Sequence, residues 1–164
     1  MKRTLPIMRI LLLLPMAATL CASAGEIHDA VRSRDAARLE QLLKAQPGSV
    51  NDVLPQGITA LHMAAAEDSA DMVRLLVANG AKIDARTESG ATPLHWAALM
   101  NAGKAAKALL DAGANTVVEA MGGLSPLALA RQKDSQAVVA VLEAAKVKPV
   151  PEKIVPLPAT GSSI

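Results

Sequence analysis

Aromatic residues are almost absent from this chain of 164 residues, which has one tryptophan and neither tyrosine nor phenylalanine. Hydrophobic residues still make up 51% of it, so a core must be built from alanine, leucine, valine and methionine. Alanine, leucine and methionine favour helices, whereas strands are enriched in β-branched and aromatic residues. The composition therefore predicts a helical protein, and the length suits one domain.

The N-terminal segment has the organisation of a cleavable secretory signal. A basic segment, residues 2–9, precedes the apolar run 10–14, and Ala22-Ser23-Ala24 supplies the small side chains of an A-x-A cleavage site. A membrane-spanning helix needs about 20 apolar residues, and Pro15 interrupts this shorter run. We therefore expect a signal peptide over residues 1–24, cleavage before Gly25 and delivery to the periplasm, with no stable membrane anchor afterwards.

Cysteine occurs once, at Cys21, and would be removed with the signal. Lipid attachment at Cys21 is disfavoured because Leu20 stands where a lipoprotein signal has a small residue. A mature chain without cysteine has no disulfide, no thiol nucleophile and no thiolate metal site. This composition suits an oxidising compartment.

An excess of positive charge is also lacking in the mature chain. The full sequence has 17 Lys and Arg residues against 15 Asp and Glu residues. Three of the basic residues and none of the acidic residues lie in residues 1–24, so 14 face 15 and the mature net charge is about −1. The isoelectric point near 8.9 belongs to the precursor, and no nucleic-acid partner is expected.

A regular repeat runs through the rest of the chain. Gly57, Gly90 and Gly123 are equally spaced, with a step of 33, and a similar phrase follows each of them. The phrases are Thr59-Ala60-Leu61-His62, Thr92-Pro93-Leu94-His95 and Ser125-Pro126-Leu127-Ala128. The same step links two further sets: Leu43, Leu76, Leu109 and Leu142, and Asp35, Asp68, Asn101 and Asp134. Several sets of positions that share one spacing indicate a repeated structural unit.

Residues 90–122 show how one unit is expected to fold. Thr92 is predicted to cap a helix that Pro93 begins, because proline at the first helical position loses no hydrogen bond. This helix should run to about Met100, with Asn101 in a left-handed turn, which Asn and Asp tolerate well.

A second helix should follow the turn, bury Leu109 and Leu110 and end at Gly113, which is expected to have a positive φ. Residues 81–90 have few helix signals and are predicted to form an extended, hairpin-like finger.

The segments 90–98 and 109–115 resemble the signature of the ankyrin repeat, whose T-P-L-H-x-A motif at a 33-residue period is highly specific. The resemblance covers about residues 26–146. It implies an all-α ankyrin-repeat solenoid of about four helix pairs with short projecting fingers. The predicted parts are an N-terminal capping repeat at 25–56, ankyrin repeats at 57–89 and 90–122, a C-terminal capping repeat at 123–147, and a Pro-rich flexible tail at 148–164.

His62 and His95 stand at equivalent positions of adjacent repeats, and the resemblance implies that they bond to backbone. Neither is followed by a carboxylate at a metal-ligand spacing. Trp96 is expected to pack between repeats, with ligand stacking as the alternative.

No residues set an acid beside a base, and neither a nucleophile elbow nor a Gly-rich phosphate loop occurs. His28 has no evident partner in the sequence. We therefore expect no enzymatic activity, no metal and no cofactor. We expect a monomer, and the resemblance implies that it binds another protein on the concave surface of the stack.

The variable surface positions of the family map here to the finger tips and the ends of the first helices. Leu99 and Met100 stand where the family often has polar residues, and exposed apolar groups beside charges suit a protein-binding site. The alternative is that these two side chains pack against the next repeat. The candidate protein-binding residues are Gln56, Glu67, Arg86, Glu88, Ser89, Leu99, Met100, Met121 and Lys133.

The expected function is a non-catalytic protein–protein interaction module in the periplasm, such as an adaptor. An inhibitor or immunity-type protein that blocks a toxic enzyme would use the same surface, so the sequence leaves that alternative open. A metal or haem carrier is a third alternative, and it would show as colour or bound metal in the purified protein.

The export hypothesis predicts the first residue of the mature protein. Mass spectrometry of the chain expressed in a Gram-negative host should show Gly25 at the N-terminus. A chain that keeps Met1 and stays in the cytoplasmic fraction would contradict this localisation.

Overall fold

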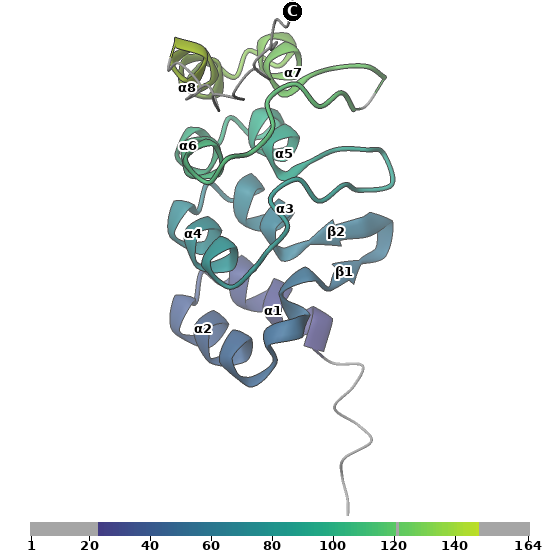
Figure 1. The fold of residues 1–164 in the computed structure, drawn as a ribbon, viewed down its shortest axis with the longest axis vertical. Helices are drawn as coiled ribbons and strands as arrows, with labels where there is room; N and C mark the ends of the chain where they lie inside the picture. The colour runs from purple at the N-terminus through teal and green to yellow at the C-terminus, as the bar shows by residue number, and fades with distance from the viewer. Residues whose placement is uncertain (1–22, 121, 148–164) are drawn as a thin grey trace, which may run out of the picture.

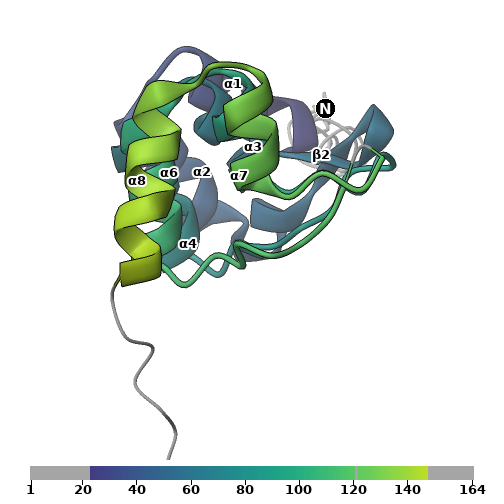
Figure 2. The same cartoon turned by 90° about the horizontal axis from the view of Figure 1, so that it is seen from above.

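The computed structural model describes residues 23–120 and 122–147, and these form a stack of helix pairs (Figure 1). The described helices are α1 (Ser23–Arg32), α2 (Ala36–Ala45), α3 (Ala60–Ala66), α4 (Ala70–Ala78), α5 (Pro93–Leu99), α6 (Gly103–Asp111), α7 (Pro126–Gln132) and α8 (Gln136–Val147). The odd-numbered helices form an inner layer and the even-numbered helices an outer layer, as the view from above shows (Figure 2). The all-α solenoid of about four helix pairs is therefore confirmed. The predicted signal peptide, apart from its last two residues, and the Pro-rich tail lie outside the described residues.

The fingers project from the inner layer, and only the first contains regular strands among the described residues. Two short 3-10 helices, η1 (Pro47–Asn51) and η2 (Pro55–Gly57), flank β1 (Val53–Leu54), which pairs antiparallel with β2 (Ile58–Thr59). In the second finger, the Thr87 N–H donates to the Ala91 carbonyl at 3.0 Å. The finger predicted for residues 81–90 is thus closed like a hairpin but forms no strand.

Helix boundaries follow the local signals in the central repeat. Thr92 is the N-cap of α5 and Pro93 is its first residue. Asn101 has a φ of +54° in the turn after α5, as expected. After α6, Gly113 has a φ of +92°, which confirms the predicted left-handed end of the second helix.

Small side chains let the helices of neighbouring pairs approach closely. Ala97, Ala98, Ala105 and Ala106 are fully buried between the layers. Where α6 meets α8, a Cβ added at Gly103 would lie only 2.9 Å from the Cβ of Ala137. A core of this kind fills its volume by short distances between helices rather than by large rings.

Buried histidines tie each inner helix to the next repeat. The His62 Nδ1 accepts a hydrogen bond from the Thr59 backbone N–H at 3.2 Å, and its Nε2 lies 3.1 Å from the Ala91 carbonyl oxygen. A carbonyl can only accept, so the neutral imidazole must carry its proton on Nε2. His95 makes the equivalent contacts one repeat later, at 3.2 Å and 3.1 Å. The structural role expected for both residues is confirmed.

His28 extends this series into the first repeat, and the expectation that it has no evident partner is wrong. Its side chain is 2% exposed, and its Nε2 lies 3.3 Å from the Ile58 carbonyl oxygen. His28 stands one position earlier than the regular step from His62 to His95 would place it. The first repeat therefore keeps the bonding histidine of the T-P-L-H phrase although it lacks the threonine and proline.

The same one-residue offset corrects the set of turn residues. Arg34, not Asp35, has the positive φ, at +56°, that Asp68, Asn101 and Asp134 have in the later repeats. Asp35 instead caps α2 by accepting a hydrogen bond from the Arg38 backbone N–H.

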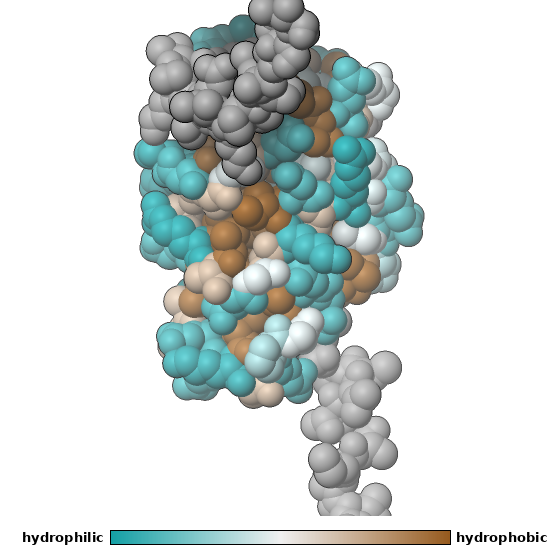
Figure 3. Space-filling model, viewed as in Figure 1, coloured by the Kyte–Doolittle hydropathy of each residue, from teal (hydrophilic) through white to brown (hydrophobic). Residues whose placement is uncertain are grey.

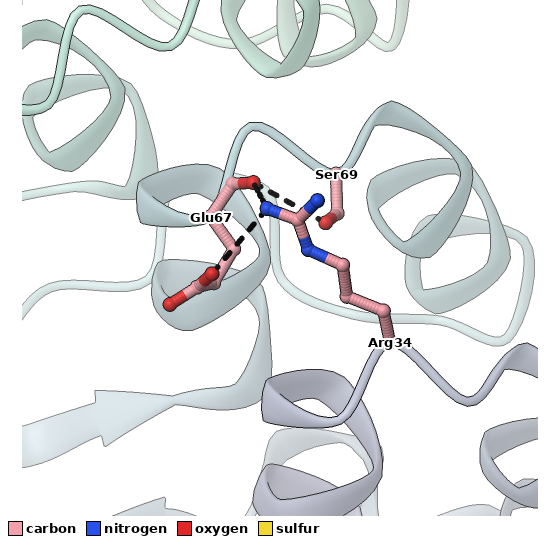
Figure 4. Close-up of polar contacts among 3 residues, drawn as sticks. All are labelled: Arg34, Glu67 and Ser69. Carbon is pink, nitrogen blue, oxygen red and sulfur yellow. Dashed lines mark hydrogen bonds and ion pairs between the residues drawn. The ribbon is translucent and has the colours of Figure 1, made fainter.

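The Arg34 side chain crosses to the turn of the next repeat, as Figure 4 shows. Its guanidinium donates to the Glu67 carbonyl at 2.7 Å and lies 3.5 Å from the Glu67 carboxylate. The Ser69 hydroxyl donates to the same carbonyl at 3.4 Å. This exposed contact links the first and second repeats at the end of the stack opposite to α7 and α8 (Figures 1 and 4).

Replacing Gly113 with valine should lower the melting temperature of the whole array. A Cβ at this position meets no atom within 4 Å, so the cost is the left-handed backbone alone, about 1–2 kcal/mol or more for a β-branched residue. Thermal unfolding followed by circular dichroism measures the effect. Gly48 is the matched control, because it also has open space but no positive φ. Equal melting temperatures for the two variants would contradict this account of the helix end.

The buried histidines should make the protein less stable in mild acid. Burial lowers the pKa of His62 and of His95, so the unfolded chain takes up protons at a higher pH than the folded chain does. The free energy of unfolding should therefore be constant above the ordinary histidine pKa of about 6.5 and fall as the pH drops below it. Urea unfolding at a series of pH values tests this. A constant free energy of unfolding between pH 7 and 5 would contradict it.

Candidate functional site

The candidate binding residues form two separate rows. Gln56, Arg86, Glu88 and Ser89 lie in the first two fingers and are all exposed. The second row stands at the C-caps of successive inner helices α3, α5 and α7 and consists of Glu67, Met100 and Lys133. An inner helix of seven residues, about 10 Å long, separates the rows. Met121, the remaining finger residue, lies outside the described residues.

The residues of the C-cap row differ in what they offer a partner. Glu67 is half-buried and already contacts Arg34. Met100 is 59% exposed, one of the few large apolar side chains that the described surface presents. Lys133 is exposed, so an apolar group and a positive charge stand one repeat apart.

Leu99 behaves differently from its neighbour, and of the two alternatives that the sequence left open it takes the packed one. Its side chain is only partly exposed and packs against the core. The last turn of α5 directs residue 99 toward the neighbouring repeats and leaves residue 100, beyond the end of the helix, in solvent. Of the two open alternatives, packing therefore holds for Leu99 and exposure holds for Met100.

The first two fingers and α5 line an open hollow of about 460 Å³, which we call the finger hollow. Its lining residues are Gln56, Ile58, Thr87, Glu88, Ser89 and Trp96. Three of them, Gln56, Glu88 and Ser89, are candidate residues that the sequence had identified.

The backbone holds the two fingers against each other beside the hollow. The Glu88 N–H donates to the Gln56 carbonyl at 2.9 Å. A Cβ added at Gly57 would lie 3.3 Å from the Thr87 Cα, so glycine permits this close approach. Gln56 and Gly57 both have positive φ, +70° and +75°, and this turn places the Gln56 side chain at the tip of the finger.

Trp96 forms the helical wall of the finger hollow. It stands on α5 and meets the His62 ring edge-on, with 5.7 Å between the ring centroids. The side chain is half-buried, so the expected packing between repeats accounts for only part of its surface. Its Nε1 is buried without a hydrogen-bond partner among the described residues.

A second apolar surface lies on the face crossed by the connections from the outer helices to the fingers. Figure 3 shows hydrophobic patches along this face, between the outer helices and the fingers. Val117, in the connection after α6, is 75% exposed. Val117 was not predicted as a site residue, because it lies outside the finger tips and helix ends to which the resemblance assigns the variable surface positions.

Within residues 23–120 and 122–147, no group of three or more His, Cys, Asp or Glu residues is placed to hold a metal ion. None of the described helices is both long and apolar enough to cross a membrane.

Comparison with known proteins agrees with this architecture. The family model described as "Ankyrin repeats (3 copies)" matches residues 27–120, which include the second half of α1, the helices α2 to α6 and the first two fingers. No curated protein is significantly similar to the chain. Ankyrin repeats are generally protein–protein interaction modules and are typically non-catalytic. The repeated helix pairs, the fingers and the family match together show that this chain belongs to the ankyrin repeat family.

Proposed function

We propose that the protein is a non-catalytic interaction module of the periplasm, which binds a partner protein through its finger tips and the concave face of its inner helices. The family match supports binding of a protein in general. The signal-like segment at residues 1–24 supports the compartment.

The exposure of Met100 is the observation that carries the proposal. Burying a methionine side chain on association contributes about 1.5–3 kcal/mol, and Met100 leaves 59% of its surface free for this purpose. Charged residues of opposite sign flank it in the neighbouring repeats, at Glu67 and Lys133. A central apolar group within a polar rim is the usual arrangement of a protein-binding surface.

Met100→Ala should weaken binding of the partner by about tenfold or more without changing the helix content. Truncating a central apolar side chain of an interface commonly costs more than about 1–2 kcal/mol. Affinity capture from periplasmic extract, with the exported chain as bait, supplies the partner, and calorimetry then compares the variants. Leu99→Ala is excluded from this test because Leu99 packs against the core and its loss would also destabilise the fold.

Lys107→Ala is the control, because Lys107 is exposed on the outer helix α6, where it pairs with Asp111. Val117→Lys tests the alternative face. Loss of binding in Val117→Lys, together with unchanged binding in Met100→Ala, would overturn the proposal in favour of the connection face.

A further inference from the structure

We propose that the finger hollow is the pocket for a basic side chain, arginine in particular, presented by the partner protein. This inference rests on the proposed function and names the chemical group that one part of the surface recognises. The hollow has a volume of about 460 Å³, within the range of about 300–1,000 Å³ that ligand sites occupy. It therefore has room for a long side chain and some adjoining main chain.

The charge of the hollow favours a cation. Among the residues that the structure describes, Glu88 is the only ionisable one that lines it. The Glu88 carboxylate is exposed and has no ion-pair partner in the described part of the chain. Arg86 stands two residues earlier but does not line the hollow. An acidic partner residue would meet the Glu88 carboxylate, whereas a basic residue would pair with it.

The apolar walls suit the rest of an arginine side chain. Trp96 and Ile58, both half-buried, are the apolar members of the lining. Indole is the best of the aromatic rings at attracting a cation over its face, and arginine is the most frequent partner. The aliphatic part of the side chain would lie against Ile58 while the guanidinium reaches the carboxylate.

The polar lining favours arginine over lysine. The Gln56 side-chain carbonyl and the Ser89 hydroxyl can both accept hydrogen bonds, in addition to the Glu88 carboxylate. A guanidinium presents five N–H donors in a plane and can satisfy several acceptors at once, whereas an ammonium is a compact point charge.

Packing alone does not explain the tryptophan at this place. Met63 and Leu129 occupy the equivalent positions of the neighbouring repeats, and both pack in the core without an aromatic ring. The buried Nε1 of Trp96 has no acceptor among the described residues, and a buried donor without an acceptor lowers stability. The indole therefore lowers the stability of the core at this position, whereas an indole ring is favourable in a site that binds a cation.

Nuclear magnetic resonance can test the site directly because Trp96 is the only tryptophan of the chain. The probe is acetyl-Gly-Arg-Gly-amide, added to the 15N-labelled chain purified after export. The matched probe replaces arginine with citrulline, which is uncharged and nearly the same shape. The arginine peptide should shift the single indole N–H signal in a saturable way and bind about tenfold more tightly than the citrulline peptide.

Glu88→Gln should remove this preference, so that the two peptides bind equally weakly. Glu119→Gln is the control, because it removes an exposed acid from the third finger, outside the hollow, and should leave the preference intact. Trp96→Leu introduces the residue that the next repeat has at the equivalent position, Leu129. This variant should bind the arginine peptide about tenfold more weakly in calorimetry. Circular dichroism checks that its helix content is unchanged.

Two results would overturn the inference: equal affinity of both peptides for the wild-type chain, or an arginine preference that survives Glu88→Gln. Either result would leave the proposed function standing if a captured partner still loses affinity in Met100→Ala. The proposed function fails separately if the wild-type chain retains no partner at all.

Discussion

The hydrogen bonds of the buried histidines are the constraint on which the rest of the structure depends. The imidazoles of His62 and His95 each accept from the N-cap of their own inner helix and donate to a carbonyl of the following repeat, as His62 does between Thr59 and Ala91. The acceptor carbonyl immediately precedes the next N-cap residue, Thr92. Each bond therefore fixes where the next inner helix begins and where the next finger ends.

The spacing of the inner helices also sets the positions of the fingers at the surface. Because the inner helices are held in register, the second finger comes to lie against Gly57, and its Glu88 N–H bonds to the Gln56 carbonyl. Trp96 stands one residue after His95, so the same bonds also place its ring beside the fingers. The finger hollow is thus a consequence of the repeat stacking rather than a separate structural feature.

The sequence predicted the helix pairs well because their signals are local. Thr92, Pro93, Asn101 and Gly113 each act within one or two residues, and all four behave as expected. The first repeat was harder, because its one-residue offset removes His28 from the strict period. Only a comparison that allowed an inserted residue could have aligned it with His62.

The candidate site could be predicted only in part, because it depends on contacts between repeats. Finger residues such as Glu88 were identified from the resemblance, but the hollow that they share with Trp96 requires two fingers and a helix to meet. Leu99 and Met100 are neighbours of similar hydrophobicity, and the end of α5 alone decides that one packs and the other is exposed. No local pattern distinguishes them.

The most direct test of this account is whether the repeats unfold as one unit. Fluorescence of the single tryptophan reports on the central repeat, and far-ultraviolet circular dichroism reports on all helices. If the histidine bonds and the packing between repeats couple the stack, the two signals should give the same urea midpoint and the same slope. Two separate transitions, with the tryptophan signal changing apart from the helix signal, would contradict that coupling.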